Sequence, residues 1–203
     1  MMDGMMALLT YQAGHYFATG ETPKRTGNRH PQQTPYGTFQ TKDGFVIIGA
    51  GSQRLWENLC AKVLDRQDLM ADPRFLTLKD RNQNHAVLQE QIEKTTREKD
   101  TDTWVELLNQ GSVPCGKVRT VKEAFELEQT KAREMVVEME DALRGRIKML
   151  GIPTKLSATP GKVRLMPPLL GEHTDEVLKE IGYAEDKIQA LKEFNVVRQY
   201  ATP

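Results

Sequence analysis

The sequence predicts a mixed α/β fold, and three features support this. Residues 36–48 contain two short β-rich runs separated by Lys42-Asp43-Gly44, and an Asp-Gly pair in such a position is a strong hairpin signal. Ser52 follows as the expected N-cap of a helix that continues to about residue 64. Further helices are predicted over residues 84–98 and 102–110. Strands joined to helices by short turns are typical of a compact α/β domain.

The N-terminal segment is predicted to be a helix over residues 1–17, because its apolar residues recur at helical spacing. Asp3 is the only charged residue on it apart from the histidine at position 15, so we expect this helix to be buried on most sides. A natural N-terminus is usually exposed and polar. We therefore expect the chain to begin inside a domain, with a segment preceding Met1. Residues 20–35, rich in Gly, Pro, Thr and Asn, are predicted to form an extended loop.

The second half of the chain is predicted to alternate between helices and extended segments. Gly111 is expected to end the preceding helix as a left-handed glycine, and VPCGKV at residues 113–118 is expected to be a loop. The later elements are a helix at 121–130, strands at 135–140 and 146–150 around a turn at 143–145, and an extended Pro-rich stretch at 151–168. A helix at 175–181 is expected to be capped by Thr174 and ended by Gly182, and a last helix is expected at 184–194.

We expect three domain segments. Residues 1–35 are a helix and loop of a larger domain, residues 36–150 a small α/β domain, and residues 151–203 a linker with helices that return to the larger domain. The last two helices carry an apolar stripe that needs a partner, and we expect it to dock on the helix at residues 1–17. The stripe comprises Val177, Leu178, Ile181, Ile188 and Leu191.

Composition limits the classes of function. The 203 residues carry 28 basic and 28 acidic side chains, which argues against nucleic-acid binding. The first twenty residues lack the basic n-region of a signal peptide and are too polar and short to span a bilayer. Two distant cysteines and no zinc-type cluster predict free thiols and no metal site. We therefore expect a soluble protein of the cytoplasm or of an equivalent organelle interior, without a membrane partner.

Few residues offer a catalytic pattern. Gly49-Ala50-Gly51 lies between a strand and a helix, but Arg54 stands where a dinucleotide fingerprint needs its third glycine, so we expect a tight turn there and leave open only a phosphate contact at the helix start. Cys115 has no base near it in sequence and is expected to be a small buried residue. Asn28, Arg29 and His30 lie in the polar loop, where functional residues often gather. The other histidines are expected to be structural or on the surface: His15 buried, His85 at the surface and His173 in a capping segment.

The order of several segments resembles the family III CoA-transferases, whose members include formyl-CoA, carnitine and succinyl-CoA:glutarate enzymes. The resemblance covers essentially the whole chain, and no single segment carries it alone. The segments are the helix MMDGMMALLTYQAGHYFATG, the pattern from Gly27 to Gly44, GFVIIGAGSQRLWENLC, ADPRF, the GVPCG-like loop at residues 111–116 and PPLLGEHTDEVLKEIGY.

The resemblance implies a fold, a reaction and an assembly. Family members are interlocked, ring-shaped homodimers, in which the N-terminal part and the C-terminal end of each chain build a large Rossmann-like domain and the residues between them build a smaller α/β domain. An aspartate attacks the acyl-CoA thioester and forms an acyl-aspartyl anhydride, CoA thiolate gives an aspartyl-CoA thioester, and an acceptor acid completes the exchange. The substrates are an acyl-CoA and a carboxylic acid, and CoA enters as substrate, without a separate cofactor. The sequences KDGFVIIGAG and GEHT resemble those of the dicarboxylate-type enzymes of the family most closely.

The nucleophile of that family is the first aspartate of a D-x-S-M-x-D pattern. Here it is expected just upstream of Met1, together with the CoA-binding half. Asp3 matches the second acidic position, so the role is not transferred to it, although it stays the candidate within the chain. The corresponding loop of relatives closes over the acyl intermediate, which makes Asn28 and His30 candidate substrate-binding residues.

Three functional alternatives remain open at the level of sequence. The chain is a piece of a CoA-transferase that is inactive alone, or a degenerate homologue that acts as a subunit, or a member of the acyl-CoA racemase branch. The DNA upstream of Met1 discriminates the first two.

Overall fold

The computed structural model describes residues 1–141 and 144–200, which form two compact units. One unit comprises residues 1–119, and the other comprises the described residues from 120 onward. The fold is mixed α/β, as the sequence predicts. The division into segments 1–35, 36–150 and 151–203 stays a proposal. No helix among the described residues is long and apolar enough to cross a membrane.

The first unit is built on a three-stranded antiparallel sheet in the order β1-β2-β3. Strands β1 (Tyr36–Gln40) and β2 (Phe45–Gly49) form the predicted hairpin, with Tyr36 opposite Gly49 and Gln40 opposite Phe45. Strand β3 (Cys115–Lys117) pairs with β2, so the expectation of a loop over residues 113–118 is wrong. Three residues are too few to give a period-two pattern, and the partner strand lies far away in sequence.

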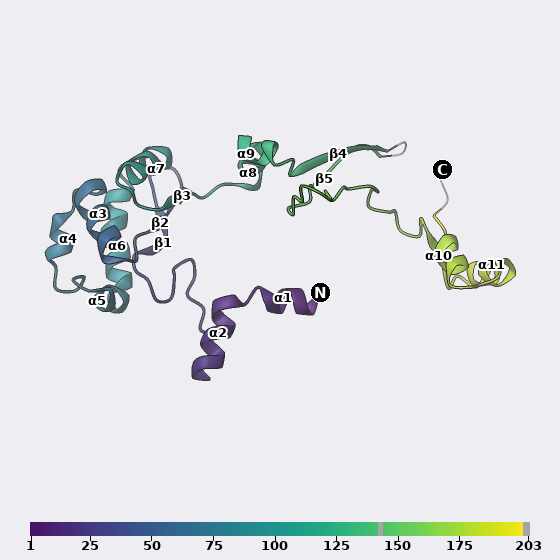
Figure 1. The fold of residues 1–203 in the computed structure, drawn as a ribbon, viewed down its shortest axis with the longest axis horizontal. Helices are drawn as coiled ribbons and strands as arrows, with labels where there is room; N and C mark the ends of the chain where they lie inside the picture. The colour runs from purple at the N-terminus through teal and green to yellow at the C-terminus, as the bar shows by residue number, and fades with distance from the viewer. Residues whose placement is uncertain (142–143, 201–203) are drawn as a thin grey trace. The chain divides into compact units, whose positions relative to one another are not determined.

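Helices cover this sheet and enclose the core. Helix α6 contacts β1, and α7 contacts β2 and β3 (Figure 1). Large apolar side chains such as Trp56, Phe75 and Trp104 are fully buried between them. The helical elements are α3 (Gln53–Asn58), the π-helical turn η1 (Leu59–Val63), α4 (Gln67–Ala71), α5 (Leu78–Gln83), α6 (His85–Thr96) and α7 (Thr101–Gln110).

Some of these helices depart from the sequence prediction. Ser52 is the N-cap of α3, as predicted, but the helix changes to π-helical geometry at Leu59. The short helices α4 and α5 lie where the sequence predicts no helix. Thr77 and Asp80 form a capping box at the start of α5, a signal that the sequence contained.

The glycine at the end of α7 serves packing. Gly111 directly follows the last residue of α7, so the predicted end of this helix is confirmed, but its φ of −75° is right-handed instead of left-handed. A Cβ at position 111 would lie 2.4 Å from Cγ2 of Val63, which is closer than real Cβ contacts allow. The left-handed residue is instead Ser112, with φ 56°. Gly111 therefore lets α7 approach η1.

The hairpin turn is tied to α7 by a small polar network. The carboxylate of Asp43 accepts hydrogen bonds from the Thr101 amide at 2.8 Å and the Thr101 hydroxyl at 2.7 Å. These bonds hold the pKa of Asp43 below its usual value, the Thr101 side chain contributing most. The Asp-Gly turn thus fixes the N-terminus of α7 as well as the hairpin.

The N-terminal segment forms two helices, α1 (Met2–Ala7) and α2 (Thr10–Thr19). The single predicted helix is broken because Thr10 takes a positive φ of 30°. Neither helix has a buried residue, so the contacts within this chain do not bury this segment as the sequence predicts. Met2, Tyr11 and Phe17 are 75%, 87% and 81% exposed.

The second unit contains short helices and one hairpin. Leu127, with extended ψ, divides the predicted helix at 121–130 in two. The strands at 135–140 and 146–150 are confirmed, whereas position 143 of the predicted turn lies outside the described residues. The elements are α8 (Val121–Glu126), α9 (Glu128–Ala132), β4 (Val136–Asp141), β5 (Gly145–Leu150), α10 (Thr174–Glu180) and α11 (Glu185–Glu193).

The two C-terminal helices differ from the prediction at their first residue. Thr174 is the first helical residue of α10 instead of its cap, and its hydroxyl donates to the Arg198 carbonyl at 2.8 Å. Gly182 takes a left-handed φ of 90° just after α10, as its predicted role as the end of that helix requires. Of the predicted apolar stripe, Ile188 is buried, while Val177 and Ile181 stay exposed. The docking of this stripe on residues 1–17 stays a prediction.

Candidate functional site

The loop before β1 is fixed by a backbone hydrogen bond to that strand and packs closely against two glycines. The His30 amide donates to the Tyr36 carbonyl at 2.8 Å. A Cβ at Gly37 would lie 3.0 Å from the Asn28 carbonyl oxygen. A Cβ at Gly51 would lie 2.7 Å from the side chain of Gln33. Gly51 therefore leaves space for the side chain of Gln33 in this loop. This packing role accounts for a glycine in the Gly49-Ala50-Gly51 turn without a bound dinucleotide.

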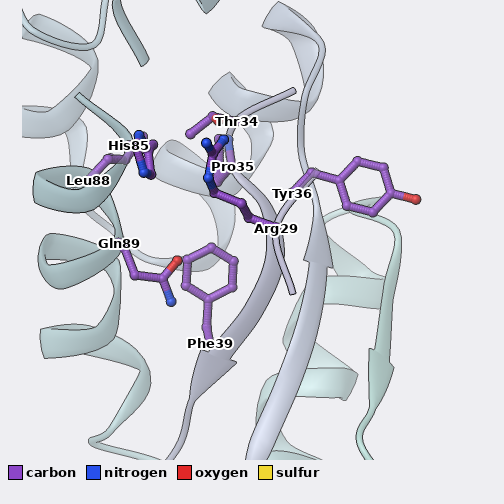
Figure 2. A pocket seen from close by; sticks show the side chains of 8 residues that line it. All are labelled: Arg29, Thr34, Pro35, Tyr36, Phe39, His85, Leu88 and Gln89. Carbon is purple, nitrogen blue, oxygen red and sulfur yellow. The ribbon is translucent and has the colours of Figure 1, made fainter. Parts of the chain in front are cut away.

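A groove runs between this loop and the start of α6. It has a volume of about 350 Å³ and opens to solvent. A smaller hollow continues from it toward the core, where Figure 2 shows Arg29 extending from the loop toward His85 and Gln89 lying beside the Phe39 ring. The groove is lined by Thr26, Asn28, Arg29, Thr38, His85, Ala86, Gln89 and Glu90.

The structure places the two candidate residues of the loop differently. Asn28 lines the groove. His30 does not line it and instead stacks on Tyr36, with ring centroids 5.3 Å apart and an interplanar angle of 19°. Nδ1 of His30 accepts a hydrogen bond from the Gln32 amide at 3.1 Å. The proton of a neutral His30 ring must then sit on Nε2, which makes that atom a donor.

His85 is a groove residue that sequence reasoning missed. It is half-buried at the first position of α6, so the expectation of a surface histidine is wrong. Its Nδ1 lies 3.1 Å from the Asn82 carbonyl, which can only accept. The neutral ring therefore carries its proton on Nδ1 and leaves Nε2 as an acceptor. The only hint in the sequence was its position beside Asn84 at a predicted helix start.

Arg29 is the one arginine or lysine among the residues that line the groove. It is half-buried, and one guanidinium nitrogen donates weakly to the His30 carbonyl at 3.4 Å. Within residues 1–141 and 144–200, no carboxylate lies within ion-pair distance of it, whereas Arg66, Arg74 and Arg97 each have an acidic partner. Most of its five N–H donors are thus uncommitted.

Arg81 anchors the loop from the core side. Its side chain is 1% exposed, and its guanidinium lies 5.1 Å from the Trp56 ring centroid. Nε donates to the Thr34 carbonyl at 2.9 Å, and another nitrogen donates to the Phe75 carbonyl at 3.0 Å and to Gln53 Oε1 at 3.1 Å. Burial lowers the pKa of Arg81 from its ordinary value. A buried guanidinium held by carbonyl oxygens therefore joins the loop to the ADPRF segment.

The remaining candidates are not among the residues that line the groove. Asp3 is exposed on α1. His15 is half-buried on α2, and His173 is exposed, with Nδ1 3.1 Å from a Glu176 oxygen. Burial raises the pKa of the Cys115 thiol, and it raises that of Cys60 to about 12, so neither is a ready thiolate. No group of three potential metal ligands occurs among the described residues.

Comparisons with known proteins define the class of this chain. The model of "CoA-transferase family III" matches residues 1–174, so the chain belongs to this family. The succinyl-CoA:glutarate CoA-transferase of Homo sapiens is 30% identical over 203 residues, which are 100% of this chain and 46% of that protein. The acetyl-CoA:oxalate CoA-transferase of Acetobacter aceti is 34% identical over 188 residues, or 92% of this chain and 47% of that protein.

A solved structure agrees with this assignment. The crystal structure of a CAIB/BAIF family protein from Brucella suis matches with a TM-score of 0.70 and 32% identity. The match covers 88% of this chain and 46% of that chain. The chain thus spans about half the length of the relatives it matches, and the expected family resemblance is confirmed.

Proposed function

We propose that this chain supplies the C-terminal half of an enzyme that moves CoA between an acyl-CoA and a dicarboxylic acid. The observation that carries the proposal is the family match over residues 1–174. The two curated relatives described above are named for glutarate and oxalate, which are both dicarboxylic acids. The loop that carries Asn28 supports the proposal, because it is fixed by buried contacts at the rim of an open groove.

The proposed reaction proceeds through carboxyl exchange. An aspartate carboxylate attacks the thioester carbonyl, CoA thiolate leaves, and an acyl-aspartyl anhydride forms. The thiolate then attacks the aspartyl carbonyl, the donor acid leaves, and an aspartyl-CoA thioester forms. The acceptor carboxylate attacks this thioester, CoA thiolate leaves, and a second anhydride joins the acceptor to the aspartate. The thiolate then attacks the acceptor carbonyl of this anhydride, which forms the new acyl-CoA and frees the aspartate carboxylate.

Within this reaction the chain contributes the loop and not the nucleophile. We place the nucleophilic aspartate outside the chain, because Asp3 is exposed on a helix without buried contacts that would fix its carboxylate. His30 offers an Nε2–H donor to an acyl oxygen of the intermediate, and Asn28 offers its side-chain amide to the substrate from the same loop.

A transfer assay tests the proposed function. The chain is extended through the codons that precede Met1, and the longer protein is incubated with succinyl-CoA and glutarate. We expect glutaryl-CoA to form by mass spectrometry. Valerate, which has the same carbon number but one carboxylate, should be a poor acceptor. If neither acid accepts CoA, or if the codons before Met1 contain an in-frame stop, the chain is a non-catalytic homologue.

We also propose that the chain forms a homodimer, because α1 and α2 expose several large apolar side chains, which favours association. Light scattering after size exclusion should give twice the 23.0 kDa mass of one chain. Met5→Glu with Phe17→Glu should yield monomers, since each change places a charge among these side chains. Val121→Glu, which alters an equally exposed residue of α8, should leave the dimer intact. A monomeric unmodified chain would refute this proposal.

A further inference from the structure

The polar groups of the groove divide into those already committed and those available to a ligand. The Thr26 hydroxyl donates to the Arg29 carbonyl at 3.2 Å. The Gln89 amide nitrogen donates to the Thr38 carbonyl at 2.9 Å and to Glu93 at 2.7 Å, so both its N–H bonds are used. The available side-chain donors are the Arg29 guanidinium and the Asn28 amide, which line the same groove.

These two donors suit an oxyanion. A guanidinium presents its N–H bonds as a rigid fork that matches the two oxygens of a carboxylate. Arg29 is half-buried and has no acidic partner among the described residues, so a ligand would not have to displace an ion pair. The Glu90 carboxyl group at the edge of the groove opposes a dianion such as a phosphate more strongly than it opposes a single carboxylate.

We infer that Arg29 and Asn28 hold the free carboxylate of the dicarboxylic substrate in the groove beside α6. This inference rests on the proposed function, because thioester formation uses one carboxylate of a dicarboxylic acid and leaves the other charged. Arg29 then selects dicarboxylic over monocarboxylic acids.

A binding experiment on the chain tests the inference, since every residue of the groove belongs to the unit of residues 1–119. Glutarate is titrated into ¹⁵N-labelled chain at constant ionic strength, and the Arg29 Nε–H and Asn28 side-chain signals are followed. We expect saturable shifts at both positions and none with uncharged glutaramide.

Variants give the controls. Arg29→Gln should weaken glutarate binding by about tenfold or more, because a hydrogen bond to a charged group is lost. Arg29→Lys keeps the charge without the fork and should lie between Arg29→Gln and the unmodified chain. Arg25→Gln removes the same charge from an exposed position of the same loop and should bind normally. Equal weakening by Arg25→Gln, or the absence of saturation, overturns the inference.

Two further results separate the possible failures. If 3′,5′-ADP, the nucleotide part of CoA, saturates Arg29 and glutarate does not, the groove takes a phosphate and the carboxylate assignment is wrong. If the longer protein transfers CoA to glutarate and Arg29→Gln leaves its KM unchanged, the inference fails while the proposed function stands. Glutarate binding at Arg29 in a protein that transfers no CoA supports the carboxylate site and refutes the proposed function alone.

Discussion

Arg81→Met is expected to lower the free energy of unfolding of the first unit by about 3 kcal/mol, because it leaves buried carbonyl oxygens without a donor at a cost of ~1–3 kcal/mol each. The affected carbonyls are those of Thr34 and Phe75, both buried residues. Methionine fills much of the same space and removes the cost of burying a charge. Its side chain cannot donate, however, so the loss at the carbonyls outweighs that gain.

Thermal unfolding measures the effect, and a drop of roughly 10 °C is expected for a unit of this size. Hydrogen exchange gives the local result: the His30 amide, bonded to the Tyr36 carbonyl, should exchange faster as the loop loosens. Arg54→Met changes an exposed arginine of α3 and should stay within about 0.5 kcal/mol of the unmodified chain. Equal stabilities of the Arg81→Met and Arg54→Met variants would show that the buried bonds of Arg81 contribute nothing.

The elements that could be predicted from sequence are those with strong local signals. The β1–β2 hairpin follows from the Asp-Gly turn between β-rich runs, and the network of Asp43 and Thr101 then reinforces it. The start of α3 follows from Ser52 as its cap. In both cases the signal is local: the hairpin is marked by its Asp-Gly turn, and the start of α3 is marked by a cap that bonds to a residue three positions later.

The elements that could not be predicted depend on contacts between distant residues. Strand β3 exists because β2 offers a free edge to Cys115–Lys117. Gly111 fits the helix-end pattern, yet its role is set by Val63, which is remote in sequence. Helices α4 and α5 are too short for helical periodicity to emerge.

The candidate site divides in the same way. Asn28 was predicted because it lies in a polar loop and in the family pattern, and it lines the groove. His85 and Arg81 were missed, because a histidine or arginine among polar residues is usually exposed. Their roles depend on bonds to Asn82 and Thr34, and the second of these spans 47 residues.

The second large effect expected is a complete absence of CoA transfer by the chain alone. The reaction needs a carboxylate held against the thioester in a formed CoA site, because positioning supplies much of the rate. Asp3 is exposed on the short helix α1, which has no buried residue. The groove at Asn28 and Arg29 offers donors for an oxyanion but holds no acidic group other than Glu90 at its edge.

The most direct test is chemical trapping of an acyl-enzyme. The purified chain is incubated with succinyl-CoA and then with hydroxylamine, which converts an acyl-aspartyl anhydride or an aspartyl-CoA thioester into an aspartyl hydroxamate. The Asp3→Asn variant and the longer protein serve as controls, and peptide mass spectrometry locates the modification. We predict no hydroxamate in the chain alone and one on an aspartate upstream of Met1 in the longer protein; a hydroxamate on Asp3 that the Asp3→Asn variant abolishes would contradict this account.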